Sequence, residues 1–352
     1  MSGQLRLQQV ARVELGTYVT SLAWSPDGGR IAAAHDWGSK VAVIDTSSWR
    51  VRATIQRSSA ISQATLGFAA GGRELVTRPG EIRTLHNNPF VFGVFETDTG
   101  RPLRHARWPT DFPTSRVPEG LAVSPDGKFV VLFDENRQGG YLHVYDVATA
   151  EFVQAIVPPR RVTFTLASIN HGNHLAVDAN YSLAERHPSV RKAIEIFDLP
   201  GLRRERVIPA HIPSFASLAW SPQGDRLASG AQGLDSAPDP TTGEFRLWRD
   251  EDPIRVWDAS SGRMIVSFAG QFEPIGTLAW HPSGDLLLAK SAKGTGERGS
   301  LVQVLPAGGG SPVLRYFAPG EEVIRVPCFC PRAGLLAWGE EGAVRVFRLI
   351  PA

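Results

Sequence analysis

Two histidines three residues apart, His171 and His174, are the first side chains in this sequence that could do chemistry. Imidazole is a common zinc ligand, but a zinc site needs three or four ligands, and no third ligand is in view. Cys328 and Cys330 could also bind a metal, yet Phe329 separates them and no histidine is near. We therefore expect the histidines to be an exposed turn pair, and the thiols to be buried without a metal.

The second candidate is an aspartate that recurs at the end of similar, strand-like sequence segments. It stands at four places, Asp45, Asp146, Asp198 and Asp258. Repeated carboxylates resemble a ring of ligands, but turns such as DTSSW, DVATA and DASSG follow them. In such turns a carboxylate accepts backbone N–H hydrogen bonds. We therefore interpret these four acids as structural.

Enzyme motifs do not accompany these residues. The chain has no GxxxxGK[ST] phosphate loop, no HExxH zinc helix, no GxSxG nucleophile turn, and no GxGxxG on a strand-to-helix turn. No serine, histidine and acid are marked as a catalytic triad. The sequence predicts no catalytic residue, no metal and no cofactor, so we expect a protein that is not an enzyme.

Composition limits the class of protein further. The chain has 352 residues, a formal net charge of +2 and 42% hydrophobic residues, which suits a repeat architecture or a barrel. This charge balance does not favour nucleic acid or an anionic membrane, so we expect neither partner. No apolar run approaches the roughly 20 residues of a membrane helix. The N-terminus lacks the apolar core of a signal peptide. The two cysteines are poorly placed for a disulfide with each other, which favours a cytoplasmic location.

The elements that position these residues are marked by a recurring turn. LAWSPDGGRIAAA (22–34) returns as LAVSPDGKFVVLF (121–133), LAWSPQGDRLASG (218–230) and LAWHPSGDLLLAK (278–290). Pro, Asp and Gly at these positions favour a tight turn between two strands. Related turns begin at Ser25, Ala69, Ser124, Asn170, Ser221, His281 and Cys330. They lie roughly 44 to 60 residues apart, a period typical of a solenoid, a propeller or an array.

A third strand follows each turn and alternates between apolar and mostly polar residues. The seven words are VAVID, FGVFE, LHVYD, IEIFD, IRVWD, VQVLP and VRVFR. This alternation indicates a strand with one face more buried than the other. A fourth short strand, such as VRATI or MIVSF, completes each unit. The sequence therefore predicts an all-β, seven-bladed β-propeller of four-stranded antiparallel blades. Trp24, Trp220 and Trp280 share one strand position, and we expect them to pack between blades.

These words resemble the WD40-repeat family in a degenerate form, over essentially the whole chain. IRVWD (254–258) matches the end of that repeat, and SPDG and SPQG match its common turn. Trp257 and Asp258 form the complete Trp–Asp pair, His211 roughly corresponds to the family's Gly-His pair, and Asp45, Asp146 and Asp198 keep the acid alone. The resemblance implies structural roles for these six residues. Related seven-bladed propellers of other families fit the same pattern.

One domain over 1–352 is expected, with blades at about 17–56, 60–106, 117–157, 162–208, 214–269, 274–317 and 321–352. Blade seven ends with VRVFRLIPA and lacks a fourth strand, while the N-terminal strand 4–13 has no other partner. We predict that this strand completes and closes the last blade, as in the WD40 pattern. The pairing would remove two exposed sheet edges.

Functional residues are expected at one end of the blades. With the strands of each blade labelled a to d, the b–c loops and the links between blades share one rim, the top rim. These connections are long and irregular, and the longest is 231–253 in blade five, where FRLW could also form an extra hairpin along the blade edge. Long loops on a rigid scaffold concentrate function. The top rim also holds residue types that dominate protein–protein hot spots: Trp37, Phe90, Trp108, Phe112, Arg137, Tyr181, Arg186, Phe245, Arg246, Trp248, Arg249 and Arg298.

Two kinds of function fit this pattern. The first is a non-enzymatic scaffold that binds a partner protein through the top rim, as a subunit of a larger complex. The alternative is a channel-site enzyme, such as a metal-dependent lactonase-like propeller, or a sensor of a small ligand. Top-rim acids that could hold a cation are Asp36, Asp134, Glu135, Glu185 and Asp235. The innermost strands read mostly as small, hydroxyl or apolar residues, with Glu119 and Arg325 as the few charges, which favours the scaffold.

Overall fold

The fold is built almost entirely of β-strands. In the computed structural model the described residues are 4–57, 66–78, 90–109, 120–136, 139–156, 162–164, 167–181, 192–211, 215–231, 234–238, 245–249, 252–269, 275–291, 299–319 and 324–352. Within them the only helical element is the short 3-10 turn η1 (Ala70–Gly72). The described part of the chain contains no helix that is long and apolar enough to cross a bilayer.

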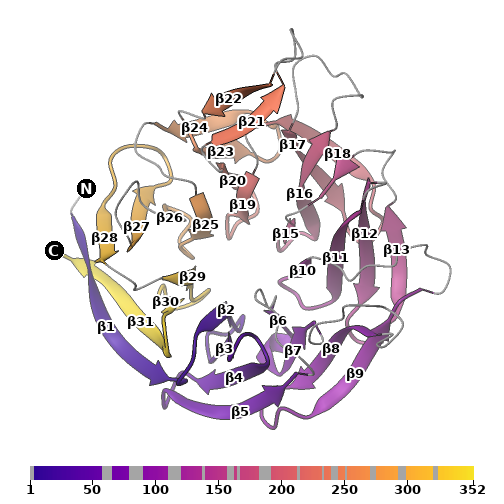
Figure 1. The fold of residues 1–352 in the computed structure, drawn as a ribbon, viewed down its shortest axis with the longest axis vertical. Helices are drawn as coiled ribbons and strands as arrows, with labels where there is room; N and C mark the ends of the chain where they lie inside the picture. Colours follow the sequence, from indigo (N-terminus) through magenta and orange to yellow (C-terminus); the bar gives the residue numbers. More distant parts are fainter. Residues whose placement is uncertain are drawn as a thin grey trace. The chain divides into compact units, whose positions relative to one another are not determined.

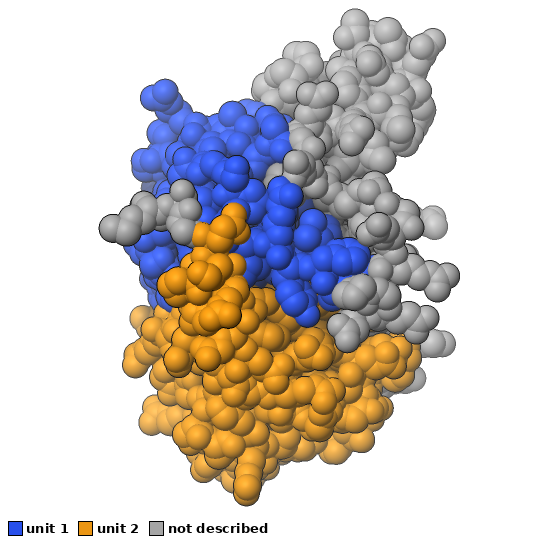
Figure 2. All heavy atoms as spheres, turned by 90° about the vertical axis from the view of Figure 1, so that its left-hand side faces the viewer, with its two compact units in different colours: residues 1–2, 135–141, 156–321 blue, residues 3–134, 142–155, 322–352 orange. Residues whose placement is uncertain are grey.

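Contacts divide the chain into two compact units, which Figure 2 colours separately. One unit comprises residues 1–2, 135–141 and 156–321, and the other comprises 3–134, 142–155 and 322–352. The first contains blades four to six. The second contains blades seven, one and two and most of blade three. That the whole chain is a single domain stays a prediction.

Blades one to three and blade seven each form a four-stranded antiparallel sheet (Figure 1). Blade one contains β2 (Val19–Trp24), β3 (Arg30–His35), β4 (Lys40–Asp45) and β5 (Arg50–Gln56). Blade two contains β6 (Leu66–Ala69), β7 (Glu74–Thr77), β8 (Phe90–Glu96) and β9 (Pro102–Arg107). Blade three contains β10 (Gly120–Val123), β11 (Phe129–Asn136), β12 (Gly139–Asp146) and β13 (Phe152–Ile156). Blade seven contains β29 (Arg325–Phe329), β30 (Leu336–Gly339), β31 (Ala343–Pro351) and β1 (Leu5–Glu14).

Blades four to six repeat the pattern with two local changes. Blade four has a divided inner strand, since β14 (Val162–Thr163) and β15 (Ala167–Ile169) both pair with β16 (His174–Tyr181), followed by β17 (Lys192–Asp198) and β18 (Arg204–Pro209). Blade five contains β19 (Phe215–Trp220), β20 (Arg226–Ala231), β23 (Ile254–Asp258) and β24 (Met264–Phe268). Blade six contains β25 (Ile275–Trp280), β26 (Leu286–Ser291), β27 (Gly299–Pro306) and β28 (Leu314–Pro319). These seven sheets confirm the predicted seven-bladed β-propeller.

The insertion in blade five forms its own hairpin. β21 (Leu234–Pro238) pairs antiparallel with β22 (Phe245–Arg249), from Leu234 opposite Arg249 to Pro238 opposite Phe245. IRVWD is β23 and pairs with β20, so it is the third strand of the blade. The FRLW segment therefore forms a hairpin as considered, but the described strands place it in a separate two-stranded sheet and not along the edge of blade five.

Tryptophan side chains join neighbouring blades. Trp24, Trp220 and Trp280 end the innermost strands of blades one, five and six, and each is less than a tenth exposed. Each indole Nε1 donates to a backbone carbonyl in the innermost strand of the preceding blade. The acceptors are the oxygens of Cys328 at 3.3 Å, Ser168 at 3.1 Å and Ala219 at 2.9 Å, respectively. The expected packing of these tryptophans between blades is confirmed.

The N-terminal strand completes blade seven, as predicted. β1 pairs antiparallel with β31, from Leu5 opposite Pro351 to Glu14 opposite Ala343, with a bulge between Gln9 and Ala11. Without β1, the outer edge of β31 would present unpaired backbone groups to solvent.

Replacing Leu7 by proline should destabilise the protein by about 1–3 kcal/mol, because proline cannot donate an N–H and its ring restricts the strand. Leu7 lies opposite Leu349 in the β1–β31 pair. Urea unfolding followed by circular dichroism measures the change. Leu7→Thr keeps the N–H and the strand propensity and serves as the control. Equal midpoints for Leu7→Pro and Leu7→Thr would contradict a structural role for this pairing.

Candidate functional site

The loop between β3 and β4 is a tight turn that holds Trp37. Gly38 N donates to His35 O at 2.9 Å, so Asp36 and Trp37 are the two central turn residues. Both have left-handed backbones, with φ of 53° and 56°, and Gly38 follows at 80°. A left-handed conformation costs a residue other than glycine roughly 1–2 kcal/mol. Backbone strain of this kind is found at functional sites, where the surrounding structure maintains it.

Polar contacts hold this turn in place. Asp36 N donates to Thr17 Oγ1 at 2.9 Å, and the same hydroxyl lies 3.3 Å from His35 Nδ1. The Asp36 carboxylate accepts from Ser39 Oγ at 3.0 Å and pairs with Lys40 Nζ at 3.1 Å. The hydrogen bonds from Lys40 and Ser39 lower the pKa of Asp36. The Asp36 carboxylate therefore binds residues of its own loop and of the start of β4.

Trp37 is the most exposed large apolar side chain among the described residues, at 61%. Its ring centroid lies 5.7 Å from that of Tyr18, at an interplanar angle of 56°. The guanidinium of Arg325, from the innermost strand of blade seven, lies 5.5 Å from the Tyr18 ring centroid. We call Tyr18, Trp37 and Arg325 the Trp37 cluster. It combines an exposed indole with a neighbouring ring and cation at the top end of blade one, where its b–c loop and the link from blade seven meet.

Sequence reasoning identified Trp37 but missed Tyr18 and assigned Arg325 to the inner-strand charges. Tyr18 stands in the link before β2, and its position beside Trp37 depends on the loop geometry. The available signal was that links between blades share an end with the b–c loops.

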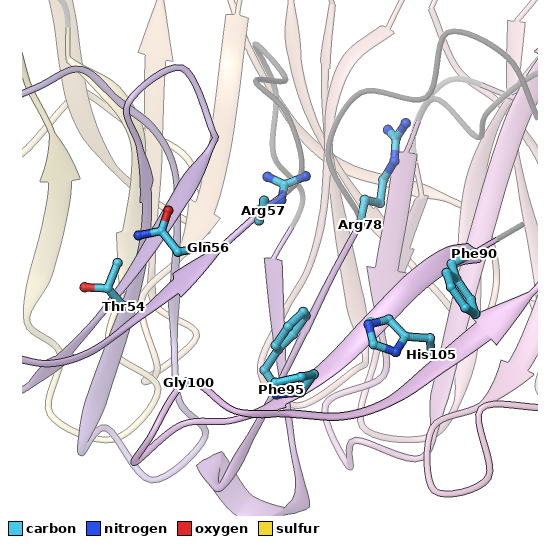
Figure 3. Close-up of a pocket in the computed structure, with 10 residues that line it drawn as sticks. Thr54, Gln56, Arg57, Arg78, Phe90, Phe95, Gly100 and His105 are labelled. Carbon is cyan, nitrogen blue, oxygen red and sulfur yellow. The ribbon is translucent and has the colours of Figure 1, made fainter. Parts of the chain in front are cut away.

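Phe90 packs within its own blade, whereas Trp108 packs against blade three. Phe90 begins β8, its ring lies 4.9 Å from that of His105, and the guanidinium of Arg107 lies 5.3 Å from the Phe90 ring. It also lines a pocket between blades one and two (Figure 3). Trp108 follows β9, meets the His143 ring edge-on at 5.2 Å, and packs against the core between blades two and three. Both are partly buried.

The structure describes only the backbone of several other predicted top-rim residues. Tyr181 ends β16, and β22 contains Phe245, Arg246, Trp248 and Arg249. Phe112, Arg137, Arg186 and Arg298 lie outside the described residues. Among the top-rim acids considered for a cation, Asp134 and Glu135 belong to β11, Asp235 belongs to β21, and Glu185 lies outside the described residues.

At the opposite ends of the blades, the repeated aspartates bind their own turns. Asp45 Oδ1 accepts from Ser47 N at 2.9 Å and Ser48 N at 3.0 Å, and hydrogen bonds led by the Ser47 hydroxyl lower the pKa of Asp45 to about 2. Asp258 accepts from Ser261 N at 2.7 Å, and hydrogen bonds led by the Ser260 hydroxyl lower its pKa to about 2.

The two remaining repeat aspartates make the same kind of contact. Asp146 accepts from Thr149 N at 2.9 Å, and Asp198 accepts from Arg203 N at 2.5 Å. In each of the four blades the carboxylate satisfies backbone donors of the c–d turn, which is a stabilising role.

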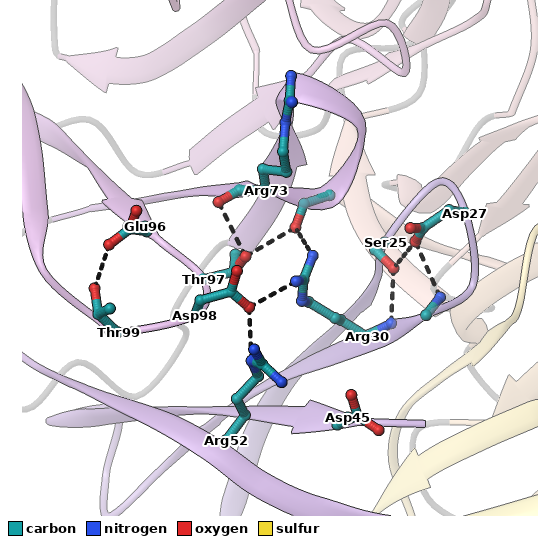
Figure 4. Close-up of polar contacts among 12 residues, drawn as sticks. Ser25, Asp27, Arg30, Asp45, Arg52, Arg73, Glu96, Thr97, Asp98 and Thr99 are labelled. Carbon is teal, nitrogen blue, oxygen red and sulfur yellow. Dashed lines mark hydrogen bonds and ion pairs between the residues drawn. The ribbon is translucent and has the colours of Figure 1, made fainter. Parts of the chain in front are cut away.

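Arginines join the lower ends of blades one and two (Figure 4). Arg30 Nη1 donates to Gly72 O at 3.0 Å, and its Nη2 lies 2.7 Å from Asp98 Oδ1. Arg52 Nε also contacts that carboxylate oxygen, at 2.6 Å. The side chains of Arg30, Arg52 and Asp98 therefore connect blade one to blade two.

The family-like residues of blade five form a buried hydrogen-bonded chain. His211 Nε2 lies 2.8 Å from Ser229 Oγ, and Trp257 Nε1 donates to the same oxygen at 2.8 Å. His211, Ser229 and Trp257 come from the link, the b strand and the c strand, and all three are at most 5% exposed. This chain ties the link to the sheet.

The metal candidates do not assemble a site among the described residues. His174 Nε2 lies 3.3 Å from Glu205 Oε2, and His171 is exposed. No three His, Cys, Asp or Glu side chains in the described segments converge on one point. Cys328 and Cys330 are free thiols, and burial raises the pKa of Cys328 to about 12.

Comparison with known proteins agrees with this architecture. The family model described as WD domain, G-beta repeat (WD40) matches residues 11–45, which run from β1 through β4. An uncharacterized WD repeat-containing protein of Synechocystis sp. is 24% identical over 164 residues. That match covers 47% of this chain and 38% of the relative, so the chain spans well under two thirds of the relative's length.

Seven four-stranded blades make the chain a β-propeller. It is similar to the WD40-repeat family over residues 11–45, which match the family model, and over the 164 residues aligned with the Synechocystis protein. Propellers of this family are commonly protein-interaction scaffolds and are generally not enzymes.

Burial of His143 makes stability depend on pH. His143 is 1% exposed, and burial lowers its pKa from 6.5 to about 4. The folded state favours the neutral form of His143. The stability that depends on this neutral form is therefore present above pH 6.5 and is lost as the pH falls toward 4. Between pH 7.5 and pH 4.5, we expect the free energy of unfolding of His143→Phe to fall by about 2–3 kcal/mol less than that of the wild type.

Urea unfolding at the two pH values measures that difference. Titrating carboxylates contribute to both proteins, so the comparison isolates His143. Equal losses in the two proteins would show that His143 is protonated at little cost in the folded state.

Proposed function

We propose that this propeller is a non-enzymatic scaffold that binds a partner protein at the top ends of its blades, as a subunit of a larger cytoplasmic complex. The observation that carries the proposal is the Trp37 cluster. A 61% exposed tryptophan on a strained, well-supported turn costs stability, and binding is the function that such an exposed indole serves best. The free thiols of Cys328 and Cys330 support a reducing compartment.

Residue chemistry in the cluster suits a protein partner. Trp, Tyr and Arg dominate interface hot spots because they offer large contact areas together with hydrogen-bond donors. The Tyr18 and Trp37 rings are already in contact, and Arg325 lies over Tyr18, so little side-chain freedom remains to be lost on binding. The lower ends of blades one and two, in contrast, use Arg30, Arg52 and Asp98 in contacts between blades.

Replacing Trp37 by alanine should weaken partner binding by at least about tenfold, as expected for a hot-spot tryptophan. Affinity capture of the tagged protein from its native lysate, quantified by mass spectrometry, measures the effect. Met264→Ala removes another exposed apolar side chain, 52% exposed on the outer strand of blade five, and is the matched control. If Trp37→Ala and Met264→Ala capture equal amounts of a partner protein, that partner does not bind at the Trp37 cluster.

The β21–β22 hairpin provides a separate test of the top-end proposal. Ala231 N donates to Pro253 O at 2.8 Å, so a short Gly-Ser linker in place of residues 232–250 should leave blade five intact. We expect the shortened protein to unfold at the same urea midpoint as the wild type and to capture less partner. If the shortened protein captures as much partner as the wild type, the hairpin is not part of the interface. If its urea midpoint is lower, the hairpin stabilises blade five.

A further inference from the structure

Arg325 brings a positive charge to the Trp37 cluster. Its guanidinium lies 5.5 Å from the Tyr18 ring centroid. Its Nε atom is buried without a hydrogen-bond partner, whereas the residue as a whole is partly exposed. Within the described segments, the side chain makes no ion pair. An arginine always carries its charge and offers five N–H donors, so much of the hydrogen-bonding capacity of Arg325 is unused by the described residues.

Two acids beside the cluster bind other cations. The Asp36 carboxylate pairs with Lys40 Nζ at 3.1 Å. Glu340 directly follows β30, the strand that pairs with β29, and its carboxylate lies 2.9 Å from Arg345 Nε. Neither acid is paired with Arg325, which therefore remains a positive charge to which a ligand can be complementary.

A bulge in the innermost strand of blade seven sets the position of this arginine. The β29–β30 register shifts between Arg325 and Cys328, where Val326 and Pro327 stand opposite the single residue Trp338. Val326 has a φ of 42°, which is an outlier for a β-branched residue. Bulges redirect neighbouring side chains, and strain of this kind is typical of ligand-binding sites. The bulge and the strain thus accompany the side chain that lies over Tyr18.

Other blades share the bulge but not the arginine. The innermost strands of blades one, five and six are bulged at Thr20, Ala216 and Gly276. When VTSLAW, FASLAW, IGTLAW and IRVPCF (324–329) are aligned, Arg325 occupies the position of these three small residues. Because the blades pack with a small residue here, the packing of the propeller does not require the arginine.

We propose that the Trp37 cluster binds an acidic segment of the partner protein, with an Asp or Glu carboxylate against Arg325 and a neighbouring apolar side chain against Trp37 and Tyr18. A guanidinium binds a carboxylate through two parallel hydrogen bonds, and the two rings provide the apolar contact area. This inference rests on the proposed scaffold function and specifies the chemistry of the partner.

Selection from a random-peptide phage library on the immobilised full chain tests the proposal. We expect the wild type to enrich peptides in which Asp or Glu stands close to Trp, Phe or Leu, and Trp37→Ala not to enrich them. Enriched peptides that depend on Trp37 but lack an acid would overturn this inference and leave the scaffold function standing. Enrichment of no peptide that depends on Trp37 would contradict both.

The affinity of one enriched peptide, measured by fluorescence anisotropy, tests the contact with Arg325 directly. Arg325→Gln should weaken binding by at least about tenfold, because it removes the charge-assisted partner of the carboxylate. Replacing the peptide acid by its amide should weaken binding to the wild type by a similar factor, and should have little further effect on Arg325→Gln. Equal effects of the amide on the two proteins would overturn the proposal, because the carboxylate would then bind elsewhere.

Arg348→Gln is the matched control. It removes the same charge from an exposed arginine on β31 of the same blade, and should leave the peptide affinity unchanged. Circular dichroism and the urea midpoint show whether each variant is folded. If Arg325→Gln does not fold, the two peptides on the wild type still decide the question: an amide peptide that binds as tightly as the acidic one would overturn the proposal.

Discussion

An indole N–H bound to a backbone carbonyl of the preceding blade determines how three pairs of neighbouring blades pack: seven and one, four and five, and five and six. Trp24, Trp220 and Trp280 each make it from the same strand position. The bond gives a carbonyl of the innermost strand a partner, and the indole ring packs in the core between two sheets. Because one side chain performs both tasks, it fixes the distance between the innermost strands together with their register. The loops at the blade ends then start from fixed positions.

The two ends of the blades use polar groups differently. At the lower ends, Asp45 and Asp258 satisfy their own turns, and Asp98 joins two arginines. At the top end of blade one, hydrogen bonds maintain a strained turn that leaves Trp37 in solvent. The polar groups thus stabilise the blades at the lower ends and support an exposed side chain at the top end. This difference between the two ends is expected of a rigid scaffold whose loops bind a partner.

Most of the fold was predictable, because its signals are local. SPDG turns and words such as IRVWD specify a hairpin or a strand within a few residues, and counting strands assigned β1 to the last blade. The site was less predictable. Residue type alone does not tell that Trp37 is exposed while Phe90 turns toward His105. The sequence likewise does not indicate that Tyr18 lies beside Trp37, because that contact depends on the geometry of the loop and of the link before β2.

The pairing of Leu5 with Pro351 has a consequence for synthesis. β1 is synthesised well before its partner β31, and at about 5–20 residues per second the interval between them is on the order of tens of seconds. Blade seven is therefore completed only after β31 has left the ribosome, whatever the order in which the other six blades fold. Until then the nascent β1 is a free strand with apolar residues on one face, which is the kind of segment that chaperones protect and that otherwise pairs with a neighbouring chain.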